Sequence, residues 1–213
     1  MTDTLGIIKE NKLIAISRGS YGEPLISAAL ALYRGGVRAF EVTFEHDKPS
    51  SQTAEAIASL AAALPKDAAV GAGTVLSAED VRAAHDAGAA FIISPNTNAD
   101  VIAQTKRLSM VSIPGAMTPT EIIAAYEQGA DIVKLFPAGI LGVEYFKAVR
   151  APVPHIPLAA VAGITAKNIG GFAKAGAAAF GVSSTLFNKN AIQRCDFASI
   201  EEAARSMIKA MNE

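Results

Sequence analysis

The chain has 213 residues, of which 51% are hydrophobic and 18% charged, and its 19 basic and 20 acidic residues give a formal net charge of -1. This balance leaves no basic field to attract nucleic acid or an anionic membrane, so neither is expected as a partner. With one cysteine, Cys195, no apolar run of about 18 residues and no secretory signal, we expect a cytoplasmic protein without internal disulfides.

A helical pattern that ends in glycine and is followed by a short apolar run recurs along the chain. Glycine is the residue that best tolerates the left-handed cap of a helix. The four clearest glycines are Gly36, Gly88, Gly129 and Gly176. Their spacing leaves room for a further strand-like run in each gap, which gives eight alternations of strand and helix.

The expected elements follow this alternation from one end of the chain to the other. Strands are predicted over residues 13–18, 39–44, 69–75, 91–95, 110–116, 131–136, 157–163 and 179–184. Helices are predicted over residues 22–35, 50–64, 77–87, 98–107, 118–128, 142–149, 165–175 and 197–211. Ser77, Thr118 and Thr165 are expected N-caps. Eight alternations without a linker predict a (β/α)8 TIM barrel, as a single domain over residues 1–213.

Lys134 stands alone in an apolar, β-branched run, Asp131-Ile132-Val133-Lys134-Leu135-Phe136-Pro137. Burial among such side chains penalises the charged amine, so its pKa should fall. A neutral amine near pH 7 attacks ketones and can form a Schiff base. The alternatives are a lysine that reaches water at the strand end, or one that is paired for structure alone.

Glu41 is the second ionisable side chain in the middle of a predicted strand. Period-two alternation places Glu41 and Thr43 on one face and Phe40 and Val42 on the other. The apolar face should pack on helices, so Glu41 should point into the barrel and meet Lys134. The pair is either structural or an acid/base beside an amine nucleophile.

Two later loops have the composition of a phosphate pocket. The seventh strand ends at Gly163 and the eighth runs into Ser183 and Ser184. In such barrels backbone N–H groups of these adjacent loops can hold a dianion without basic side chains, although ordinary turns would look the same. Gly71-Ala72-Gly73 allows a close backbone approach but lacks the spacing of a dinucleotide fingerprint.

The histidines and the cysteine add little. His46, His85 and His155 are far apart in the chain, and no pair has metal-ligand spacing, so no metal is expected. His46 follows the second strand and could face the mouth of an active site. Cys195 has no evident base partner.

Five stretches, taken together, resemble the class I 2-keto-3-deoxy-6-phosphogluconate (KDPG) and 4-hydroxy-2-oxoglutarate (KHG) aldolases. They occur in order on the expected strands, and the resemblance runs from Leu13 to about Phe187. The stretches are Glu41-Val42-Thr43, Gly71-Ala72-Gly73-Thr74-Val75, Ile93-Ser94-Pro95, Ile113-Pro114-Gly115 and Val133-Lys134-Leu135-Phe136-Pro137.

The resemblance implies a homotrimeric barrel that cleaves a 2-keto-4-hydroxy acid to pyruvate and an aldehyde without a cofactor. It implies that Lys134 is the Schiff-base lysine and Glu41 the general acid/base. The other site residues that it implies are Arg18, Thr74, Pro95 and Phe136 for the small-molecule keto acid substrate, and Gly163 and Ser184 for its phosphate.

The sequence departs from the pattern of this family in three places. Many relatives have Thr-Gly-Gly where this chain has Val161-Ala162-Gly163, and Gly-Ser where it has Ser183-Ser184. Glu45 stands where some relatives have arginine or threonine, and it would repel an anionic substrate unless it points away. The alternatives to an aldolase are a phosphate-sugar isomerase or epimerase barrel without an imine, and a non-catalytic ligand-binding barrel.

Overall fold

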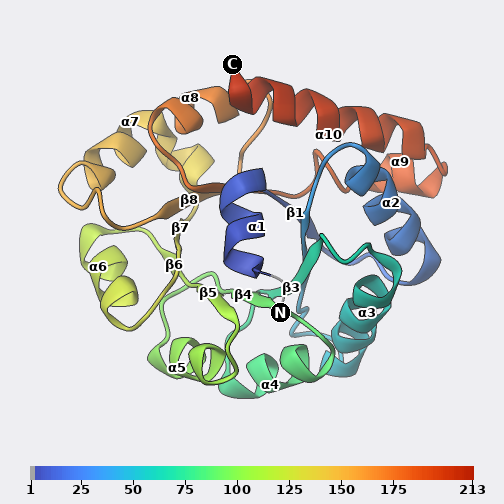
Figure 1. The fold of residues 1–213 in the computed structure, drawn as a ribbon, viewed down its shortest axis with the longest axis horizontal. Helices are drawn as coiled ribbons and strands as arrows, with labels where there is room; N and C mark the ends of the chain where they lie inside the picture. Colours follow the sequence, from blue (N-terminus) through green and yellow to red (C-terminus); the bar gives the residue numbers. More distant parts are fainter. Residues whose placement is uncertain (1–2) are drawn as a thin grey trace.

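The computed structural model describes residues 3–213 and has the predicted (β/α)8 barrel architecture (Figure 1). Its strands are β1 (Leu13–Ser17), β2 (Ala39–Thr43), β3 (Ala69–Gly73), β4 (Phe91–Ile93), β5 (Val111–Ile113), β6 (Gly115–Ala116), β7 (Val133–Leu135), β8 (Leu158–Val161) and β9 (Ala179–Val182). Its helices are α1 (Thr4–Asn11), α2 (Gly22–Arg34), α3 (Ser50–Ala63), α4 (Ala78–Asp86), α5 (Ala99–Arg107), α6 (Pro119–Glu127), α7 (Ala138–Arg150), α8 (Ile169–Lys174), α9 (Lys189–Gln193) and α10 (Phe197–Asn212).

All strand pairs are parallel, in the order β5-β4-β3-β2-β1-β9-β8-β7-β6. β5 and β6 are two pieces of the fifth predicted strand, and they are separated by Pro114. Proline has no N–H to donate to a ladder, so it interrupts the strand. The Pro114 carbonyl still accepts a hydrogen bond from Lys134 N at 2.9 Å, and the barrel closes here.

The strands separate two hydrophobic cores. Phe40 and Val42 of β2 join the outer core between the strands and the ring of helices, whereas Ala39 joins the core inside the barrel. The same alternation sends Glu41 and Thr43 inward, as the sequence predicts. Both of these polar side chains are buried.

Helix α1 was not expected from the sequence. It directly precedes β1 and lies across the middle of the ring when the barrel is viewed end-on (Figure 1). Ile8 is fully buried and joins the core inside the barrel. The helix therefore closes the amino-terminal end of the barrel and leaves the carboxyl end of the strands for chemistry.

The predicted starts of two helices need correction. Helix α8 starts at Ile169 rather than 165, and its N-cap is Asn168, whose side chain accepts a hydrogen bond from Thr165 N at 2.8 Å. Helix α7 begins four residues before the predicted 142, because a short helical turn leads into it across a non-helical Gly142. The short helix α9 was also not predicted. Ser77 and Thr118 are N-caps, each within a capping box.

No helix formed by residues 3–213 combines the length and the apolar character that crossing a bilayer requires.

Candidate active site

Lys134 projects from β7 into the barrel and is 7% exposed. Its neighbours in register are Gly115 and Ala159, two small residues that leave room for the long side chain. The amine Nζ lies 4.6 Å from the centroid of the Phe136 ring. Burial favours the neutral amine and lowers the pKa of Lys134, an effect that the charge of Glu41 opposes and that of Arg18 reinforces.

Glu41 is 2% exposed and leans across the neighbouring strand β3. A Cβ atom placed on Gly73 would lie 1.6 Å from Glu41 Oε1, so the carboxylate occupies the space that a side chain at position 73 would fill. Within residues 3–213, Glu41 Oε2 has no hydrogen-bond partner. The glycine at the end of β3 thus makes room for the acid.

The protonation of Glu41 is set by two opposing effects. Burial raises the pKa of Glu41 to about 7, against the pull of the Lys134 and Arg18 charges, which favour the carboxylate. A carboxyl group with a pKa near neutrality exchanges protons readily at the pH of most cells. The site therefore combines an amine whose pKa is lowered with an acid whose pKa is raised.

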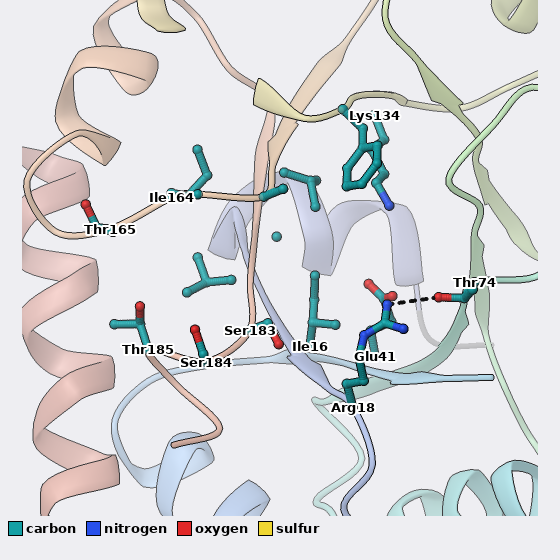
Figure 2. Close-up of a pocket in the computed structure, with 16 residues that line it drawn as sticks. Ile16, Arg18, Glu41, Thr74, Lys134, Ile164, Thr165, Ser183, Ser184 and Thr185 are labelled. Carbon is teal, nitrogen blue, oxygen red and sulfur yellow. Dashed lines mark hydrogen bonds between the residues drawn. The ribbon is translucent and has the colours of Figure 1, made fainter. Parts of the chain in front are cut away.

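Arg18 and Thr74 close one side of the site. Arg18 Nη2 donates a hydrogen bond to Thr74 Oγ1 at 3.2 Å, and Figure 2 shows its guanidinium beside the Glu41 carboxylate. Thr74 follows β3 with a left-handed φ of 56°, which is uncommon for a threonine. Such backbone positions often occur at functional sites.

These side chains line one cavity of about 210 Å³ at the carboxyl end of the barrel (Figure 2). The cavity brings together seven of the eight expected site residues: Arg18, Glu41, Thr74, Lys134, Phe136, Gly163 and Ser184. In Figure 2 the amine, the carboxylate and the guanidinium gather on one side, and the hydroxyls of Thr165, Ser184 and Thr185 lie on the other. The cavity thus has a charged end and a hydroxyl-rich end.

The hydroxyl-rich end also presents free backbone donors. Within residues 3–213, the N–H groups of Gly163, Ile164, Ser184 and Thr185 donate to no protein acceptor. The chain turns left-handed at Ala162 (φ 73°) and Gly163 (φ 71°), and the Ala162 carbonyl accepts a hydrogen bond from Gly139 N at 2.8 Å. Helix α7 is thereby held against the loop that presents the donors.

Pro95 is the expected site residue that does not line this cavity. Its carbonyl instead packs against Gly115, where a Cβ atom would lie 2.3 Å from the carbonyl oxygen. The lining includes Ile16, Thr165 and Thr185, which were not expected from the sequence to form the site. The only feature of the sequence that pointed to them was their position near the end of a strand or in the loop that follows it.

Glu45 and His46 do not line the cavity either. The Glu45 carboxylate accepts hydrogen bonds from the Tyr21 hydroxyl and from Lys48 Nζ, the latter at 2.8 Å. These two bonds, with that of Lys48 the larger influence, hold the pKa of Glu45 below its usual value. His46 Nε2 lies 2.9 Å from the Thr74 carbonyl. Glu45 therefore points away, and its charge is offset by Lys48.

Among residues 3–213, no group of three or more His, Cys, Asp and Glu side chains is placed to hold a metal ion.

Fold and site define a (β/α)8 barrel enzyme whose buried lysine and carboxylate meet at the carboxyl end of the strands. The family described as "KDPG and KHG aldolase" matches residues 5–203, and the chain belongs to this family. Its relatives are named aldolases, which are lyases, so the chain is a lyase of the aldolase type.

The individual relatives differ in the sugar acid that they are named for. A "Probable 2-dehydro-3-deoxy-6-phosphogalactonate aldolase" of Rhizobium meliloti is 36% identical over 84% of this chain and 82% of its own length. A "2-dehydro-3-deoxy-phosphogluconate aldolase" of Treponema pallidum is 37% identical over 69% and 68%. The solved structure named "Native KDPGal structure" has a TM-score of 0.84 and 32% identity, and the match covers 94% of both chains.

The raised pKa of Glu41 predicts a pH-dependent cost in stability. The folded state holds the proton up to about pH 7 and the unfolded state only up to its ordinary pKa, so folding is favoured by protonation and loses stability as pH rises through this window. Glu41→Gln cannot ionise. In urea unfolding from about pH 5 to about pH 8, the free energy of unfolding of the variant minus that of the wild type should increase as the pH rises. A difference that is constant or falls with pH would contradict the raised pKa.

Proposed function

We propose that this chain is a class I aldolase that cleaves a 2-keto-3-deoxy-6-phospho sugar acid to pyruvate and glyceraldehyde 3-phosphate. The observation that carries the proposal is the buried Lys134 amine, which faces Glu41 in a cavity whose other end presents free backbone donors. The family and the names of the relatives support the substrate class. 4-Hydroxy-2-oxoglutarate is the unphosphorylated alternative within the same family.

The chemistry starts at the Lys134 amine. It attacks the C2 carbonyl of the substrate to form a carbinolamine, and loss of water gives a protonated imine. When the C3–C4 bond breaks, its electron pair moves toward the imine nitrogen to form an enamine, and the C4 hydroxyl loses its proton as the aldehyde forms. Protonation of the enamine at C3 and hydrolysis then release pyruvate and the free lysine. We propose that no metal is needed, because the imine accepts these electrons.

Glu41 is the proposed proton carrier in these steps. Its pKa of about 7 allows it to give a proton during dehydration and to take one during cleavage. Its Oε2 atom, which has no protein partner within residues 3–213, can act directly or through a water molecule. Arg18 is proposed to meet the carboxylate of the substrate through its planar guanidinium.

The phosphate is proposed to bind at the opposite end, on the N–H groups around Gly163 and Ser184, with the Ser184 hydroxyl as a further donor. This placement follows the separation of charged and hydroxyl groups in Figure 2. Thr74 and Phe136 line the cavity beside the charged groups, and Pro95 remains an expectation of the resemblance alone. The homotrimer and the cytoplasmic location also stay predictions.

Covalent trapping tests the imine. Pyruvate followed by borohydride should leave a permanent adduct on Lys134, because reduction of the imine prevents its hydrolysis. Peptide mass spectrometry locates the adduct, and Lys134→Met is the control. An adduct on another lysine would contradict the assignment to Lys134, and no adduct would support the isomerase or binding-barrel alternatives.

Kinetics test the role of Glu41. Glu41→Gln keeps the shape of the side chain and removes the ionisable group, so turnover should fall by about 10²–10⁴-fold, as is typical for the loss of a general acid/base. A circular dichroism melt checks that the variant is folded. Near-wild-type turnover would mean that Glu41 is structural.

A panel of substrates tests the class of acid. We expect the highest kcat/KM for a phosphorylated six-carbon acid, and comparing the gluco and galacto epimers with 4-hydroxy-2-oxoglutarate ranks the candidates. Ser184→Ala should lower kcat/KM for the phosphorylated acids alone, because it removes a donor at their distal end. An equal loss for all substrates, or none, would place the phosphate elsewhere.

A further inference from the structure

A second cavity, of about 410 Å³, adjoins the candidate active site. Both cavities are lined by Arg18, Ser183 and Ser184, so these three residues form the boundary between the two spaces. The second cavity is lined in addition by Phe187, Asn188, Lys189 and Asn190. None of its lining residues is acidic, and two of them are basic.

Lys189 is the first residue of α9, and the backbone at this point is held firmly. The Asn188 side chain caps the helix by accepting a hydrogen bond from Ala191 N at 3.0 Å. Ala191 and Ile192 are buried and anchor α9 to the body of the protein. The side chain of Lys189 is exposed, but the backbone that carries it is fixed by the helix cap and by the buried residues of α9.

The amine of Lys189 lies over the loop that follows Arg18. A Cβ atom placed on Gly19 would be 3.5 Å from Lys189 Nζ and 3.3 Å from Glu45 Oε1. Glu45 already accepts hydrogen bonds from Lys48 and Tyr21. Within residues 3–213, neither Lys189 nor Arg18 takes part in an ion pair. Lys189 therefore borders the second cavity as a positive side chain outside any ion pair, with Glu45 as a nearby carboxylate, whereas Arg18 lies beside Glu41.

We propose that the second cavity is an anion subsite and that Lys189 determines specificity for the phosphorylated end of the substrate. The inference rests on the proposed function, because it assigns the distal phosphate to the boundary between the two cavities. The donors around Gly163 and Ser184 are neutral, whereas a phosphate dianion is held more strongly when a cationic donor also faces it. Lys189 supplies that charge from the side of the second cavity.

The test compares 2-keto-3-deoxy-6-phosphogluconate with unphosphorylated 2-keto-3-deoxygluconate. Lys189→Met should lower kcat/KM about tenfold for the phosphorylated acid, mainly through KM, and leave the unphosphorylated acid unchanged. Lys189→Arg keeps the charge and should retain most of the preference. Lys66→Met is the matched control, since Lys66 precedes β3 at the opposite end of the barrel and its loss changes the net charge equally.

Salt and direct binding give readouts that do not depend on the imine. The wild-type preference for the phosphorylated acid should shrink as the NaCl concentration rises, and the preference of Lys189→Met should change less. Titration calorimetry with inorganic phosphate should show about tenfold weaker binding to Lys189→Met than to the wild type or Lys66→Met.

Several results would overturn the proposal. They are an equal effect of Lys189→Met on both acids, equal effects of Lys189→Met and Lys66→Met, a wild type without phosphate preference, or phosphate binding that Lys189→Met leaves unchanged. Failure of the aldolase proposal looks different. In that case pyruvate and borohydride leave no adduct on Lys134 of the wild type, whatever the phosphate titration shows.

Discussion

Two ionisable side chains lie inside one barrel, and the residues around them are small enough for both to be buried. Taking an amine and a carboxylate out of water is costly unless they face each other or a ligand. Small residues make the arrangement possible, because Gly115 and Ala159 flank Lys134 and Gly73 leaves space for the Glu41 carboxylate. A larger side chain at position 73 would displace the acid. The glycine-rich end of β3 is thus explained by the acid beside it.

The same burial gives the pair its chemistry. It acts on both groups in the direction of the neutral form, which lowers the pKa of the amine and raises that of the acid. An amine is a nucleophile only when neutral, and an acid with a pKa near 7 can both donate and accept a proton. The cost of burial and the reactivity of the site therefore have one physical origin.

The strands and the inward direction of Glu41 could be predicted because side-chain direction in a strand follows a strict period of two. Loops have no such period, so the inward placement of Thr165 and Thr185 and the approach of Lys189 to Gly19 could not be predicted from spacing. Helix α1 buries a single residue completely, Ile8, and gives only a weak apolar pattern. The expected cap at Thr165 failed because Asn168, three residues later, is the N-cap.

The alanine at position 162 shows which part of the proposed anion pocket is fixed by backbone and which by side chains. Ala162 has a φ of 73°, a left-handed conformation that costs a non-glycine residue about 1–2 kcal/mol. Its carbonyl is held by Gly139 N, and Gly139 has no side chain to prevent the close approach. The loop therefore keeps a path that glycine would take more easily, and the N–H groups of Gly163 and Ile164 stay free. Val161 and Ala162, which stand where many relatives have threonine and glycine, change only the side chains that line the pocket. Phosphate preference in this chain should therefore depend on groups outside that loop.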